Sequence, residues 1–163
     1  MIDPQQSPKH YPRPLFYGLV VVIYTLDQLT KAWILRDFWL GKSEEVIPGF
    51  LYWTYVRNDG IAFGMFQGNN TLMAILVLLV CSLAIWWGTQ LKWKMNIVNV
   101  LAALIAAGAA GNLTDRFRLG YVVDFVDADL GFMRWPAFNV ADSAICIAVT
   151  LMLYCFWKKK PIY

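Results

Sequence analysis

Four long apolar segments dominate the hydrophobic pattern of this chain. Each has 17 to 21 residues and none contains a proline, and an α-helix needs about 20 residues to cross a bilayer. A helix satisfies its own backbone hydrogen bonds in lipid, so helices are the expected way to cross. The pattern therefore predicts four transmembrane helices, over residues 15–35, 71–91, 97–113 and 137–157.

The polar segments between these helices differ in length and charge. The tails 1–14 and 158–163 and the short loop 92–96 carry seven Lys or Arg residues against one acid. The longer loops 36–70 and 114–136 carry six basic and eight acidic residues. Short, positively charged segments stay in the cytoplasm. Both termini are therefore expected in the cytoplasm, with the two long loops facing the periplasm or the cell exterior.

The two long loops contain predicted elements of their own. Residues 46–56 are β-branched and aromatic around a Pro-Gly turn, which predicts a short, bent β-element at the outer surface. Residues 121–131 are expected to form a short interfacial helix. Trp53, Phe132 and Trp135 suit an interfacial aromatic belt. The predicted fold class is an all-α membrane protein in one domain, with four transmembrane helices, a small periplasmic β-element and a short periplasmic helix.

Composition supports a membrane protein and argues against several function classes. Of the 163 residues, 59% are hydrophobic and 15% are charged, whereas soluble domains carry about 25% charged residues. The net charge is +3, and no basic stripe with interleaved aromatic residues indicates nucleic acid. The only histidine, His10, lies in a Pro-rich tail, which argues against a zinc triad or a His-dependent nucleophile. Three cysteines inside apolar segments are interpreted as packing residues: Cys81, Cys146 and Cys155.

Acidic residues within and beside the apolar segments are candidates for function. A charged side chain at the centre of a membrane helix costs about 2.5–3.5 kcal/mol on insertion scales, so Asp27 and Asp142 need an explanation. Both lie toward the outer ends of their predicted helices, with Asp142 roughly 8 Å into the fourth at 1.5 Å per residue. Asp115 and Asp124 follow the third helix on the same side. The four carboxylates are therefore expected to gather near the outer membrane boundary.

Other polar residues follow the helical repeat, so that each set lies on one face if its helix is continuous. For the third helix, this requires that the helix continue to residue 116. Small residues four apart would let that helix pack closely against a neighbour: Ala103, Ala107 and Gly111. The polar sets are Asp27 with Lys31; Asn112 with Asp115 and Arg116; and Asn139 with Asp142 and Ser143.

Spacing leaves the roles of these residues open. Asp27 and Lys31 fit a structural ion pair better than a catalytic one. Asp115 and Arg116 either orient a loop or hold a substrate backbone. Three asparagines fit hydrogen-bonding support better than a reacting role: Asn58, Asn112 and Asn139.

Asp124 and Asp142 are one possible reacting pair. Peptide hydrolysis without a metal, Ser–His or Cys–His arrangement still needs a water nucleophile. Two close carboxyl groups share one proton because both cannot readily ionise together, so one can accept a proton from water while the other polarises the scissile carbonyl. Two further acids, Asp127 and Asp129, are interpreted as solvated loop residues.

Four sequence clusters, taken in order, resemble those of the lipoprotein signal peptidase (signal peptidase II) family of membrane aspartyl peptidases. One cluster alone would be weak evidence, but all four occur in order with four predicted helices and span nearly the whole chain. The clusters are DQLTK at 27–31, RNDGIAF at 57–63, GAAGNLTDR at 108–116 followed by GYVVDF at 120–125, and PAFNVADS at 136–143.

The resemblance implies a function. Family members cleave prolipoproteins on the N-terminal side of a diacylglyceryl-modified cysteine, and their catalytic aspartates correspond to Asp124 and Asp142. The resemblance implies that substrate or the inhibitor globomycin is contacted, or the aspartates supported, by Asn58, Gly60, Asn112, Arg116 and Asn139. It gives an architectural role to Asp27, Lys31 and Asp115. No metal or organic cofactor is implied.

The resemblance also bears on setting and partners. The family fold has four membrane helices, an outer β-cradle and a periplasmic helix, in the bacterial inner membrane. The partners implied are diacylglyceryl-modified prolipoproteins, membrane lipids and globomycin-like inhibitors, with no nucleic acid. We expect a monomer, since one chain supplies all the proposed catalytic groups.

Two positions depart from the family pattern, and two other functions compete. Ile61 replaces a usual Ala and Asp59 a commoner Thr or Asn, and these differences bear on ligand preference rather than on the reaction. A small ion or solute carrier would place acids through the membrane depth, whereas here they cluster near one face. A non-catalytic lipoprotein chaperone would tolerate loss of either carboxylate.

Overall fold

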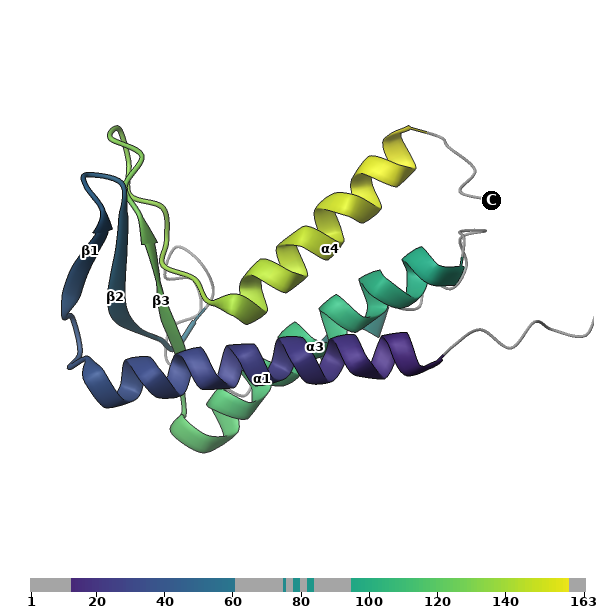
Figure 1. The fold of residues 1–163 in the computed structure, drawn as a ribbon, viewed down its shortest axis with the longest axis horizontal. Coiled ribbons are helices and arrows are strands. Elements are labelled where there is room, and N and C mark those ends of the chain that lie inside the picture. Colours follow the sequence, from purple (N-terminus) through teal and green to yellow (C-terminus); the bar gives the residue numbers. More distant parts are fainter. Residues whose placement is uncertain (1–12, 61–74, 76–77, 80–81, 84–94, 159–163) are drawn as a thin grey trace, which may run out of the picture.

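In the part of the chain that the structure describes, three long helices extend from one side of a small antiparallel sheet (Figure 1). The computed structural model describes residues 13–60, 75, 78–79, 82–83 and 95–158. Helix α3 packs against both α1 and α4. The start of α1 and the end of α4 lie at the end of the molecule away from the sheet (Figure 1). The elements are α1 (Arg13–Asp37), β1 (Ser43–Ile47), β2 (Leu51–Asn58), α3 (Met95–Leu119), β3 (Val122–Ala128) and α4 (Val140–Trp157).

The three helices correspond to three of the four predicted membrane segments, but most of their ends lie at other residues than predicted. Helix α3 continues past residue 113 to Leu119, so it carries Asp115 and Arg116 as its predicted polar face required. Helix α4 begins at Val140 rather than 137. Within the described residues, two segments are long and apolar enough to cross a membrane, Phe16–Asp37 and Val140–Trp157. The four-span arrangement stays a prediction.

Most of the second predicted helix, 71–91, lies outside the described residues. Five of its positions are described, and each has helical backbone conformation: Ile75, Leu78, Leu79, Ser82 and Leu83. Their side chains are exposed.

The predicted β-element is present as the hairpin of β1 and β2. Its turn contains Gly49 at φ 68°, a left-handed conformation that glycine adopts without steric cost. The carboxylate of Glu45 accepts a hydrogen bond from the Gly49 backbone N–H at 2.7 Å, which closes the turn. Aromatic and β-branched residues in β2 favour a half-buried strand.

The short helix expected over 121–131 is wrong. Residues Val122–Ala128 form strand β3, which pairs antiparallel with β2 and completes the order β1-β2-β3. The segment begins with consecutive valines, which favour strand, and β2 offers its free edge of backbone donors and acceptors. Pairing with a strand more than sixty residues earlier therefore decided its structure.

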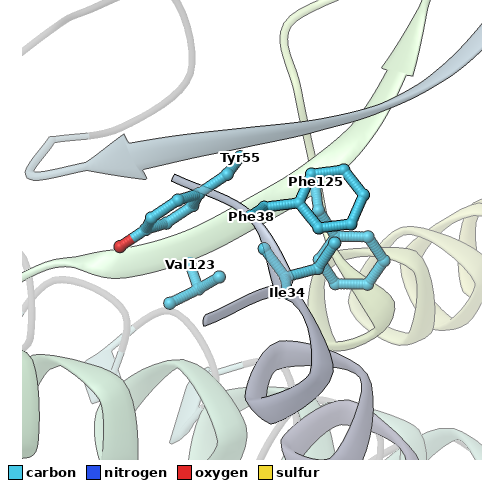
Figure 2. Packing of buried hydrophobic residues seen from close by; sticks show 5 residues of the cluster. All are labelled: Ile34, Phe38, Tyr55, Val123 and Phe125. Carbon is cyan, nitrogen blue, oxygen red and sulfur yellow. The ribbon is translucent and has the colours of Figure 1, made fainter. Parts of the chain in front are cut away.

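Two hydrophobic clusters hold these elements together. In the first, Ile34 of α1 and Phe38, which follows that helix, pack against Tyr55 of β2 and against Val123 and Phe125 of β3 (Figure 2). The second lies between α3 and α4 and comprises Leu101, Ile105, Ala109 and Ala148. The first cluster anchors the sheet to α1, and the second joins the two helices that carry the site.

The small residues on α3 allow close helix packing, as predicted. Ala103 and Ala107 are fully buried. A Cβ added at Gly108 would lie 2.5 Å from the carbonyl oxygen of Ala141, and one at Gly111 would overlap the Asp27 carboxylate. The backbone of α3 therefore approaches α1 and α4 more closely than larger residues would permit.

Candidate active site

Asp124 lies on β3 and is almost completely buried, with 1% of its surface exposed. Its Oδ1 accepts a hydrogen bond from Asn139 Nδ2 at 2.7 Å. Its Oδ2 accepts one from Asn58 Nδ2 at 2.8 Å. The two asparagines come from the start of α4 and the end of β2, so three elements meet at this carboxyl group.

Asp142 occupies the first turn of α4 and is partly exposed. Its Oδ1 accepts from Asn112 Nδ2 at 2.7 Å, and its Oδ2 accepts from the Asn139 backbone N–H at 3.3 Å. The Asp142 backbone N–H in turn donates to Asn139 Oδ1 at 2.9 Å. This reciprocal pair is a capping box, which satisfies helix N-terminal donors and starts α4 at Val140. The same contacts hold the carboxylate in one orientation.

Asn139 joins the two carboxyl groups. Its side chain is fully buried, and Nδ2 lies 2.7 Å from Asp124 Oδ1 and 3.1 Å from Asn112 Oδ1. The Val123 carbonyl oxygen lies 3.3 Å from the same nitrogen, and since an amide nitrogen has two N–H groups, the two shorter contacts are its main hydrogen bonds. The sequence-predicted residues Asp124 and Asp142 are therefore brought into one hydrogen-bonded network.

The environment of Asp124 favours a proton on this pair. Burial, and next the nearby Asp142 carboxylate, raise the pKa of Asp124, and hydrogen bonds from Asn58 and Asn139 lower it, which leaves the pKa at about 7. A carboxyl group that shares its site with another charge titrates as part of a pair. A raised pKa in this range suits acid–base chemistry in which two carboxyls share one proton.

A buried ion cluster of Lys31, Asp27 and Asp115 contacts the hydrogen-bonded network through Asn112. Lys31 Nζ lies 2.9 Å from Asp27 Oδ2 and 3.0 Å from Asp115 Oδ2, and these side chains are at most 3% exposed. Lys31 also donates to Asn112 Oδ1 at 3.1 Å. This contact places the oxygen of the Asn112 amide toward Lys31, which directs Nδ2 toward Asp142. The predicted Asp27–Lys31 pair is confirmed.

The two outer acids of this cluster also hold backbone groups. Asp27 Oδ1 accepts from the Ala141 N–H at 2.9 Å in α4. Asp115 Oδ2 accepts from the Val123 N–H at 3.1 Å in β3. The cluster thus fixes the segments next to Asp142 and Asp124 relative to α1 and α3.

Arg116 and Gly60 are also brought to the site. Arg116 Nη2 donates to the Gly60 carbonyl oxygen at 3.1 Å, and the Gly60 N–H donates to Asn58 Oδ1 at 3.0 Å. Arg116 Nε is buried and has no hydrogen-bond partner among the residues that the structure describes. Ile61, which departs from the family pattern, lies outside the described residues.

Sequence reasoning missed or misjudged some polar residues. Asp127 is not a solvated loop acid: it is 6% exposed, and its Oδ2 accepts from Thr54 Oγ1 at 2.8 Å. Gln28 was assigned no role, yet its Nε2 lies 3.1 Å from Asp27 Oδ2 and 3.4 Å from Asp115 Oδ1. Its place beside Asp27 in the first cluster was the available signal. Ser143 donates to the Asn139 carbonyl oxygen and lies within its own helix turn.

Comparison with known proteins assigns the chain to a family. Residues 19–158 match the family described as signal peptidase (SPase) II. The chain belongs to the signal peptidase II family. This signal peptidase is 38% identical over 155 residues to the lipoprotein signal peptidase of Syntrophus aciditrophicus, covering 91% of this chain and 96% of that one. It is 41% identical over 138 residues to that of Syntrophomonas wolfei, covering 85% and 89%.

A solved structure agrees with this assignment. A bacterial membrane enzyme solved by the in meso method at 2.3 Å superposes with a TM-score of 0.82 and 33% sequence identity, over 94% of this chain and 93% of that one. The chain is therefore a peptidase and a bacterial membrane protein, as the sequence clusters predicted.

Proposed function

We propose that this signal peptidase removes signal peptides from prolipoproteins by cleaving on the N-terminal side of a diacylglyceryl-modified cysteine, with a water activated by Asp124 and Asp142. The observation that carries the proposal is the bond of Asn139 to both carboxyl groups, through Nδ2 to Asp124 and through its backbone N–H to Asp142. Two carboxyl groups held by one residue can share a proton without a metal ion or a histidine.

The chemistry follows from one proton on the pair. The ionised carboxylate accepts a proton from water as the water oxygen attacks the scissile carbonyl carbon. The protonated carboxyl donates its proton to the carbonyl oxygen, which gives a neutral gem-diol. The carboxyl that took the water proton then protonates the leaving nitrogen, and the other carboxylate takes a hydroxyl proton from the gem-diol as the C–N bond breaks. The pair thus returns with one proton. Both carboxyls serve as acid and base in turn.

Substrate is held by groups that surround the pair. Arg116 Nε is a buried donor without a partner among the described residues, and it suits a carbonyl oxygen of an extended peptide. The signal helix would lie between the membrane helices, the acyl chains would remain in lipid, and the sheet would cover the cleavage segment. Globomycin-like inhibitors would occupy the same groove.

We place the pair near the periplasmic face and both termini in the cytoplasm. The basic residues of the tails and the 92–96 loop support this orientation. In the structure, α1 starts and α4 ends at the end of the molecule away from the sheet (Figure 1), and β3 of that sheet contains Asp124. The enzyme is proposed to act as a monomer.

The substrate proposal predicts strict dependence on the lipid. Purified full-length enzyme in nanodiscs should cleave a diacylglyceryl-modified prolipoprotein at least about a hundredfold faster than the unmodified form, since each buried CH₂ contributes about 0.8 kcal/mol to membrane binding. Mass spectrometry of the product should show the lipidated cysteine at its N-terminus. Equal cleavage of the two substrates would contradict the lipid requirement. Binding of the lipidated substrate without cleavage would favour a chaperone. The absence of both binding and cleavage would favour a carrier.

The state of the pair predicts the pH dependence of kcat. Because the pKa of Asp124 is raised to about 7, the proton shared by the pair is lost as the pH rises through that region. Activity should therefore fall above neutral pH, approaching about tenfold per pH unit where deprotonation is complete. Gel-based cleavage assays across the pH range would measure this dependence of kcat. The integrity of the enzyme is checked at each pH. A kcat that stayed constant well above neutral pH would contradict a shared proton.

A further inference from the structure

The pairing of β2 with β3 contains a bulge. Toward the hairpin, Tyr52 pairs with Asp127 and Trp53 with Val126. Toward the site, Val56 pairs with Asp124 and Asn58 with Val122. Two residues of β2, Thr54 and Tyr55, therefore lie opposite the single residue Phe125. Bulges of this kind redirect side chains beside active sites.

The bulge decides which face of the sheet carries Asp124. If the pairing of Tyr52 with Asp127 continued without interruption, Asp124 would lie opposite Tyr55. Directly paired residues share a face, and a shift of one residue moves a strand's side chains to the other face. Asp124 would then share the face of Tyr55, which packs in the core, and would lie on the opposite face from Asn58. The observed 2.8 Å bond from Asn58 Nδ2 to Asp124 Oδ2 requires the extra residue.

A side-chain bond spans the interrupted ladder. Thr54 Oγ1, at the bulge, donates to Asp127 Oδ2 of β3 at 2.8 Å. The Ser43 hydroxyl on β1 lies 2.8 Å from the same Thr54 oxygen, so the chain of contacts crosses all three strands. Arg134 Nε lies 3.3 Å from the other carboxylate oxygen of Asp127.

Tyr55, the second residue of the bulge, is hydrogen-bonded on the side of β2 that faces away from β3. The Tyr55 N–H donates to the Lys42 carbonyl oxygen at 3.0 Å, and the Tyr55 carbonyl oxygen accepts from the Gly41 N–H at 2.9 Å. The backbone of Tyr55 is thus bonded toward the segment before β1. The Thr54 side chain provides the link on the β3 side.

We infer that Thr54 and Asp127 are positioning residues for the peptidase: their hydrogen bond holds the β2–β3 register that directs Asn58 onto Asp124. This inference rests on the proposed function, because it assigns Asn58 the task of orienting a catalytic carboxyl group. Their effect on the reaction passes through the position of Asn58.

This role predicts a defect in kcat that depends on Asn58. Thr54→Val keeps the β-branched shape and removes the hydroxyl, whereas Thr54→Ser keeps the hydroxyl. Thr54→Val should lower kcat about tenfold, as expected for a lost hydrogen bond to a charged group, with KM nearly unchanged. Thr54→Ser should retain wild-type kcat. Asp127→Ala removes the acceptor and should reproduce the effect of Thr54→Val.

Two readouts separate positioning from general stability. The Asn58 hydrogen bond lowers the pKa of Asp124, so its loss should move the alkaline limb of the pH–rate profile to higher pH in both Thr54→Val and Asn58→Ala. In the double variant, Thr54→Val should add little to Asn58→Ala, because both disrupt the same contact. Thermal unfolding in nanodiscs identifies variants that fail to fold. If Thr54→Val fails to fold, Asp127→Ala takes its place in both measurements.

The outcomes distinguish this inference from the proposed function. Wild-type kcat and pH profile in folded Thr54→Val would overturn it, and so would an undiminished effect of Thr54→Val in the Asn58→Ala background. If Asp124→Asn retained cleavage in the same assay, the proposed function would fail, whatever Thr54→Val did. Inactive Asp124→Asn together with a fully active, folded Thr54→Val would reject the positioning role alone.

Discussion

Asp142→Asn and Asp124→Asn should each lower kcat by at least about a thousandfold, because each removes a group that must alternate between acid and base. An amide cannot take a proton from water or return one to the leaving nitrogen. Asparagine has nearly the same shape, so the segments around it should remain in place. The lipidated substrate should still bind, which predicts a much smaller change in its Kd than in kcat.

Both substitutions also place an NH₂ group next to other hydrogen-bond donors. The resulting loss of stability must be measured separately from the loss of catalysis. Asp124 accepts from two amide donors, Asn58 and Asn139, so one of these contacts is lost in the variant. That loss costs about 1–3 kcal/mol of stability. Thermal unfolding in nanodiscs should therefore show a lowered Tm with the protein still folded at the assay temperature.

A matched control uses an aspartate outside the site. Asp129 follows β3 and accepts from the Gly131 backbone N–H at 2.9 Å, and an asparagine there can still accept this bond. Asp129→Asn removes the same charge and should keep kcat close to wild type. Folded Asp124→Asn or Asp142→Asn with kcat comparable to the control would rule out the two-carboxyl mechanism.

Lys31→Met should destabilise the folded protein by about 3–5 kcal/mol, because removing one partner of a buried ion cluster leaves its charges unpaired. Lys31 is 2% exposed and lies between Asp27 and Asp115. Methionine has a similar length, so the loss of packing is small. The remaining effect comes from two buried carboxylates without a cation.

The same change should also affect catalysis. Asn112 Oδ1 accepts hydrogen bonds from Lys31 Nζ and from Asn139 Nδ2. Lys31→Met removes the first of these bonds and leaves only the second at this oxygen. The Asn112 amide is then freer to rotate away from Asp142. Equilibrium unfolding in mixed micelles measures the stability, and cleavage assays on the folded fraction measure kcat.

Arg36→Met is the control for an exposed ion pair. Arg36 Nε contacts Asp37 Oδ1 with side chains 74% and 38% exposed, and such surface pairs contribute little to stability. Its loss should therefore change the free energy of unfolding far less than the loss of Lys31. Equal destabilisation by the two substitutions would show that the buried cluster does not support the fold as described.

Much of the site could be anticipated from local patterns. The i, i+4 spacing of Asp27 and Lys31 predicted their ion pair, and the continuation of α3 to Arg116 followed the spacing from Asn112. The hairpin of β1 and β2 followed from aromatic and β-branched residues around Pro48-Gly49. These features depend on neighbours within one helical turn or one hairpin, so the local sequence carries their signal.

The sequence alone determined the long apolar helices, the hairpin and which polar residues share a helix face, because each depends on local periodicity. Tertiary structure decided that 122–128 is a strand and that Asp127 is buried, since both depend on pairing with β2. It also decided that Asn139 joins the two carboxyl groups and that Lys31 orients Asn112. These contacts join residues distant in the chain, and only the packing of α1, α3, α4 and the sheet brings them within hydrogen-bond distance.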